Sequence, residues 1–134
     1  MTKNNRSIDI IAQAFYGNRT HTTIRLENVD MFIWGVLDSK FEDSLPKTYK
    51  EGRTVVNVPD TDNIVIVYNK DQEKQDREDV KRYEKEGYVG KPLAVIPEIG
   101  VTIYSRCFVC RMNEAGELES LLSEDYPKFM KYLA

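Results

Sequence analysis

Two arginines stand in one long, largely apolar stretch from Val101 to Met112. A guanidinium keeps its proton at any ordinary pH, so each arginine must reach water or find an anion. On an extended strand Arg106 and Arg111 fall on opposite faces, because successive side chains alternate. Tyr104 and Phe108 share the face of Arg106. Arginine beside aromatic rings suits bidentate capture of a phosphate or carboxylate while a ring stacks on a base.

We therefore predict a non-catalytic binding protein that captures a small anionic ligand, such as a nucleotide, through Arg106 or Arg111. The predicted ligand-binding residues are Arg106, Arg111, Tyr104, Phe108, Arg25, Tyr88 and Tyr83. Replacing either Arg106 or Arg111 by alanine is expected to abolish capture and leave the fold intact. The structural alternative places these arginines at strand ends, in water or paired with Glu27 or Glu98.

Cys107 and Cys110 have the Cys-x-x-Cys spacing that redox and zinc sites use. Residues three apart on a strand point to opposite faces, so these thiols neither pair nor share a metal while the strand stays extended. A zinc site would need further ligands, and the one histidine, His21, is far upstream. We interpret both cysteines as small buried residues in a reducing compartment, and we expect no metal and no cofactor.

The remaining motifs lack essential members. The His21-Thr-Thr23 element has the His-x-Thr spacing of two-histidine phosphoesterases, but the second histidine of that chemistry does not exist in this chain. The Asp60-x-Asp62-Asn63 element opens like a calcium loop, yet Val65 stands where that loop needs glycine. We predict a turn there. Since no nucleophile and base pair is visible, an enzyme is only the third alternative.

The composition narrows the class of protein. The chain has 134 residues, 41% hydrophobic and 31% charged, which predicts one globular domain with flexibility confined to the first few residues. A formal charge of -3 provides no positive field for double-stranded nucleic acid. No apolar run approaches the roughly 18 residues that span a bilayer, so we expect no membrane contact and a cytoplasmic location.

The periodicity predicts the elements that position these residues. In the first half we expect a helix over 7–16 with one apolar face, a half-exposed strand over 20–27, a core helix from Asn28 to Phe41 and a surface loop over 40–52. A hairpin follows, with strands over 53–58 and 63–69 around Pro59. The charged segment 71–86 predicts a helix that stands mostly in solvent, supported by the pairs Glu73 with Arg77 and Glu78 with Arg82.

The second half predicts strands over 92–96 and 101–112 around a turn, a short strand over 118–121 and a final helix beginning at Ser123 or Asp125. This order favours a single α+β domain, with a mainly antiparallel sheet of about five strands and three to four helices gathered on one face. The alternative function is an interaction or inhibitory module that uses the charged helix and surface tyrosines, as a homo-oligomer or with another protein. A viral or mobile-element origin is a further open alternative.

Overall fold

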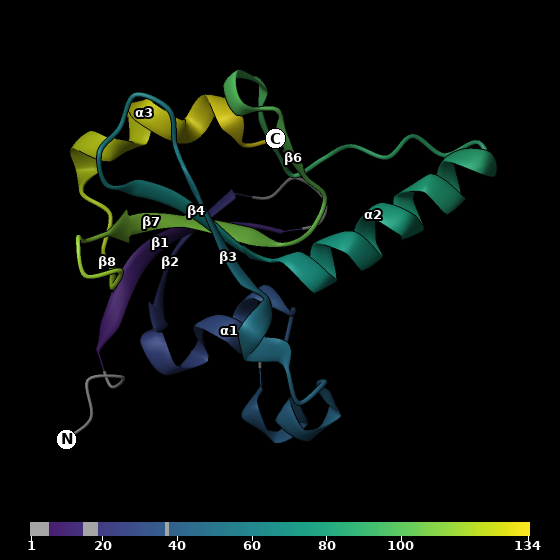
Figure 1. Cartoon of the computed structure of the whole chain (residues 1–134), viewed down its shortest axis with the longest axis horizontal. Helices are drawn as coiled ribbons and strands as arrows, with labels where there is room; N and C mark the ends of the chain where they lie inside the picture. Colours follow the sequence, from purple (N-terminus) through teal and green to yellow (C-terminus); the bar gives the residue numbers. More distant parts are fainter. Residues whose placement is uncertain (1–5, 15–18, 37) are drawn as a thin grey trace.

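A six-stranded antiparallel sheet forms the centre of the protein (Figure 1). The structure is a computed structural model that describes residues 6–14, 19–36 and 38–134. The strand order is β2-β1-β7-β4-β3, and β8 pairs with β7. The bounds are β1 (Ser7–Gln13), β2 (Arg19–Arg25), β3 (Arg53–Asn57), β4 (Ile64–Asn69), β7 (Cys107–Met112) and β8 (Leu118–Glu119). A second, two-stranded sheet pairs β5 (Ala94–Ile96) with β6 (Val101–Ile103). The predicted α+β class is confirmed.

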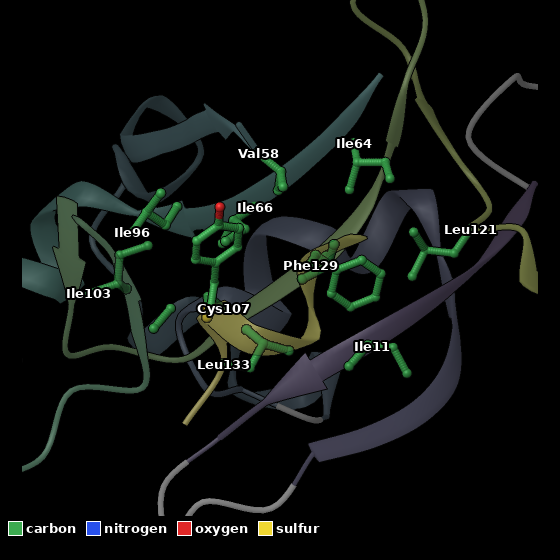
Figure 2. Packing of buried hydrophobic residues seen from close by; sticks show 13 residues of the cluster. Ile11, Val58, Ile64, Ile66, Ile96, Ile103, Cys107, Leu121, Phe129 and Leu133 are labelled. Atoms are coloured by element: carbon green, nitrogen blue, oxygen red, sulfur yellow. The ribbon is translucent and has the colours of Figure 1, made fainter. Parts of the chain in front are cut away.

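The large sheet is buried on both faces. On one face, Ile11, Ile66 and Val109 pack with the β5–β6 hairpin and the C-terminal helices α3 (Tyr126–Phe129) and η8 (Met130–Tyr132). Figure 2 shows Ile11 and Ile66 in this cluster. On the other face, Ile10, Val67 and other apolar side chains pack with α1 (Val29–Ile33). The prediction that the helices gather on one face is therefore wrong. Alternate residues of β1, β4 and β7 serve different cores.

The predicted helix over 7–16 is wrong where the structure describes it, because Ser7–Gln13 form strand β1. This strand lies between β2 and β7, so its even-numbered apolar residues enter one core and Ile11 enters the other. Burial on both faces removes the polar alternation that identifies a strand. The apolar positions then match a helical spacing by coincidence. Residues 15 and 16 of the prediction lie outside the described residues.

The predicted core helix from Asn28 to Phe41 is much shorter than expected. It is the five-residue α1, followed by a turn at Gly35, whose φ of +82° lies in the left-handed region that glycine adopts without strain. Two 3-10 helices, η4 (Ser39–Ser44) and η5 (Tyr49–Gly52), occupy most of the predicted loop. Phe41 is exposed on η4 and takes no part in the core.

The β3–β4 hairpin and the charged helix are confirmed. Helix α2 (Lys70–Lys85) begins at Asn69, whose side-chain oxygen accepts hydrogen bonds from the backbone N–H groups of Asp71 and Gln72. From there α2 extends away from the sheet (Figure 1). None of the described helices is both long enough and apolar enough to cross a membrane.

The predicted strand over 101–112 is wrong as a single element. It divides into β6 and β7, which belong to different sheets, with Tyr104, Ser105 and Arg106 between them. Two side chains of α2 form hydrogen bonds with the backbone at this break. The Glu73 carboxylate accepts a hydrogen bond from the Tyr104 backbone N–H at 3.1 Å, and the Arg77 guanidinium donates to the Thr102 carbonyl at 2.7 Å. The pair expected on the surface of α2 thus redirects the chain.

Candidate functional site

Arg106 lies over the face of an aromatic ring beside the C-terminal end of α1. Its guanidinium carbon is 5.1 Å from the centre of the Phe32 ring. That ring in turn meets Phe108 edge-on, with 6.0 Å between ring centres. Gly35 leaves room beside the arginine, since a Cβ added there would come 4.0 Å from its Nε. The guanidinium therefore lies on an aromatic pair, Phe32 of α1 and Phe108 of β7.

The charge of Arg106 has no acidic partner within the described residues. The residue is half-buried, and burial lowers the pKa of its guanidinium. The acidic side chain of α1, Asp30, is already taken by Arg53 of β3, whose Nε and Nη2 donate to its two oxygens at 2.8 and 2.9 Å. Arg106 keeps its charge at neutral pH and lacks the anion that would compensate for its lost hydration.

Arg111, near the far end of β7, differs from Arg106 because its guanidinium has acidic partners. Its Nε and Nη2 donate to the two carboxylate oxygens of Asp125, each at 2.7 Å, and Glu124 lies 3.7 Å away. The Asp125 side chain is completely buried. Arg106 lies just before β7 and contacts Phe32 of α1, whereas Arg111 lies within β7 and contacts the C-terminal segment. The structure commits the guanidinium of Arg111 to an internal ion pair.

The aromatic candidates are dispersed. Phe108 is fully buried beneath Phe32. Tyr104 lies at the break between β6 and β7, with the Arg77 guanidinium 5.4 Å from its ring centre. Tyr83 and Tyr88 are exposed at the distal end of α2, where their rings meet edge-on at 6.4 Å. Of the predicted set, only Phe108 belongs to the surroundings of Arg106.

Arg25 lies on edge strand β2 and forms an exposed ion pair with Glu27 at 3.1 Å. Both residues line a cavity of about 720 Å³ between β2, α1 and η4. Asp38 and Glu42 also line it, so acidic groups outnumber Arg25 in its wall. This charge balance does not suit an anion. Phe32 reaches both this cavity and Arg106, which itself lies outside the cavity's lining.

Cys107 and Cys110 point into different cores, as expected from their positions on one strand. Burial raises the pKa of each thiol to about 12, so both are protonated at neutral pH. Across residues 6–14, 19–36 and 38–134, no three His, Cys, Asp or Glu residues gather closely enough to hold a metal ion.

Two residues of interest cannot be singled out from the sequence. Phe32 falls on the apolar face of a predicted helix, and that position carries no information about a cation above its ring. Asp76 was one of many carboxylates on the charged helix, yet it is more than nine-tenths buried. No sequence pattern marks either, since both depend on contacts between distant segments. Comparisons with known protein families, curated proteins and solved structures found no match.

Proposed function

We propose that this protein binds a small anionic ligand at Arg106, with Phe32 as the aromatic surface beside it. The observation that carries the proposal is the half-buried Arg106 guanidinium, which has no acidic partner within the described residues. A phosphate or carboxylate would restore the charge-assisted hydrogen bonds that burial removes. The cation–π contact with Phe32 holds the planar group in place but leaves its N–H donors without an anion.

A nucleotide is the ligand class that uses both components. Its phosphate would accept two parallel hydrogen bonds from the guanidinium, and its base would lie against the apolar surface around Phe32. The ligand is bound without covalent change, because the described surroundings of Arg106 include no nucleophile with an adjacent base.

The test is a thermal-shift series with inorganic phosphate, a nucleoside monophosphate and the matching nucleoside, which lacks phosphate. A ligand at 100 times its Kd stabilises the folded state by about 2.7 kcal/mol. We expect the monophosphate to raise the melting temperature by several degrees, phosphate alone to act more weakly, and the nucleoside to have little effect. The absence of stabilisation by every anion would overturn the proposal.

Variants localise the site. Arg106→Gln is expected to weaken nucleotide binding at least about tenfold, because a hydrogen bond to a charged group contributes about 1.5–3 kcal/mol. Its folded state should be as stable as the parent or more so, since it removes a half-buried charge. Arg82→Gln on exposed α2 is the matched control and should bind normally. If Arg82→Gln lowers affinity equally, binding depends on net charge and Arg106 is not the site.

An interaction module that docks a second copy of this chain is the alternative, and one observation favours it. Residues 81–89 are all exposed, and this end of α2 with its return carries Tyr83, Tyr88 and Val89. Tyrosine is a frequent anchor of protein interfaces. Light scattering across a concentration series should then show a dimer that Tyr88→Ser weakens. Phe41→Ser, which removes an exposed ring elsewhere, should have no effect. A monomer at every concentration would contradict this function.

A further inference from the structure

A second cavity lies between α2 and the chain that runs back along it. After α2 ends, the chain returns toward the sheet over residues 86–93, and we name these residues the return segment (Figure 1). The two stretches are tightly packed, because a Cβ added at Gly90 would come 2.2 Å from Val80 Cγ1. Beside this contact is a cavity of about 500 Å³, the helix-return pocket, lined among others by Asp76, Asp79, Tyr83, Val89, Lys91 and Tyr104.

The inner wall of this pocket contains an incompletely bonded carboxylate. Only 8% of Asp76 is exposed. Its Oδ1 accepts a hydrogen bond from Gln72 Nε2 at 2.8 Å, while its Oδ2 is buried without a hydrogen-bond partner. Burial chiefly, with the negative charges of Asp79 and Glu73, raises the pKa of Asp76, which the Gln72 hydrogen bond partly opposes. A native buried polar atom without a partner needs an explanation, and the capacity to bind a cation is one.

The neighbouring cations are engaged elsewhere. Arg77 pairs with Glu73 at 3.1 Å and donates to the Thr102 carbonyl. Arg82 pairs with Asp79 at 3.0 Å and lies over the Tyr83 ring. Lys91 lines the pocket from the return segment, but no ion pair joins it to Asp76 in the described part of the chain. Asp76 therefore lines the pocket, and none of the ion pairs among the described residues includes its carboxylate.

The walls decide which kind of cation fits. The lining combines two carboxylates, those of Asp76 and Asp79, with the rings of Tyr83 and Tyr104 and the aliphatic side chain of Val89. A bare metal ion such as Ca²⁺ takes six to eight oxygen ligands, and this wall is mostly carbon. An ammonium group on a short alkyl chain matches it better, because the charge bonds to carboxylate and the methylenes pack on rings. The volume of about 500 Å³ is in the range of small-molecule sites.

We propose that the helix-return pocket binds a primary alkylammonium group, with the buried Asp76 as its counter-ion and Tyr83 and Tyr104 as aromatic walls. The same chemistry is offered by a free aliphatic diamine and by a lysine side chain. This site is separate from Arg106, which lies outside the lining of the pocket and requires a ligand of opposite charge. The failure of either proposal leaves the other standing.

Calorimetric titration tests it with three probes: 1,4-diaminobutane, N-acetyl-lysine amide and calcium chloride. Saturable binding of the diamine alone assigns the site to free amines, and equal binding of the lysine derivative extends it to lysine side chains. Either result supports an ammonium site. Binding of calcium in preference to both amines, or no saturable binding of any amine at millimolar concentration, overturns the proposal.

Variants test the role of each charge. Asp76→Asn has nearly the same shape and should weaken diamine binding at least tenfold. The unliganded variant should melt at the same or a higher temperature, which excludes unfolding as the cause. Glu78→Gln, exposed on the same helix, is the matched control and should bind normally. An equal loss in Glu78→Gln would overturn the site.

A variant of Lys91 tests whether the bound ligand is positively charged. If the ligand is a cation, removing this lysine relieves repulsion, and Lys91→Gln should strengthen diamine binding about two- to fivefold, as for a partly exposed charge pair. A weaker diamine complex in Lys91→Gln would mean that this lysine helps to hold the ligand, and the proposal would be wrong.

Discussion

The guanidinium of Arg111 and the carboxylate of Asp125 form a bidentate ion pair that connects the sheet to the C-terminal segment, with both hydrogen bonds at 2.7 Å. Asp125 Oδ2 also accepts a hydrogen bond from the Leu122 backbone N–H at 2.8 Å. One completely buried carboxylate thereby joins β7 to the chain that covers one face of the sheet. Arg111 consequently stabilises the folded state through this ion pair.

Arg111→Met should destabilise the protein, in contrast to the effect expected from the sequence. Removing the guanidinium leaves the Asp125 carboxylate buried without its ion-pair partner, which costs about 3–5 kcal/mol. Urea unfolding followed by circular dichroism measures the loss. The control is Arg82→Met, which breaks the exposed ion pair with Asp79 on α2 and should cost far less. Similar losses in both variants would contradict the assigned role of the buried pair.

The same pair should make stability depend on acid pH. The pKa of Asp125 is lowered chiefly by the hydrogen bond from Arg111. The hydrogen bond from the Leu122 backbone and nearby positive charges lower this pKa further, while burial opposes them. A carboxyl whose pKa is lower in the folded state stabilises it above the unfolded value, near 3.9, and loses this contribution as pH falls.

We therefore expect the free energy of unfolding to fall below about pH 4, and to fall less steeply in Asp125→Asn. Urea titrations of both proteins between pH 2 and pH 6, a range of about four units around the unfolded pKa, compare the two slopes. Parallel curves for the parent and Asp125→Asn would show that other carboxylates are responsible.

The two cysteines should be unreactive in the native state. Both are completely buried, and burial raises the pKa of each thiol to about 12, so almost no thiolate is available. Iodoacetamide at neutral pH, followed by mass spectrometry, should leave both unmodified, and both should react in denaturant. Mild oxidation should not join them, because they enter different cores. Rapid native alkylation of either thiol would contradict its burial.

Gly90→Ala should destabilise the return segment. The added methyl group would overlap Val80 Cγ1, and overpacking of this kind costs about 1–3 kcal/mol. Val80→Ala removes the opposing methyl groups, so the double variant should lose less than the sum of the two single losses. Urea unfolding of all four proteins completes this cycle. Additive losses would show that the two residues do not meet.

Local signals in the sequence were enough for several elements. The β3–β4 hairpin follows from β-branched runs around Pro59, and α2 follows from the charge pattern of segment 71–86. The opposite orientations of Cys107 and Cys110 follow from strand alternation alone. In each case neighbouring residues determine the conformation, so no knowledge of distant segments is needed.

Tertiary packing decided the rest. β1 is a strand because β2 and β7 pair with it on both sides, which its apolar spacing does not reveal. The break at Tyr104 depends on two hydrogen bonds with α2, a segment well upstream in the chain. The Glu73 carboxylate accepts one from the Tyr104 backbone N–H, and the Arg77 guanidinium donates the other to the Thr102 carbonyl. The same holds for function, because Arg106 and Arg111 look equivalent in sequence. Only the folded chain places Arg111 against the buried carboxylate of Asp125 and Arg106 over the ring of Phe32. A side chain's charge is local, but its partner is chosen by the whole fold.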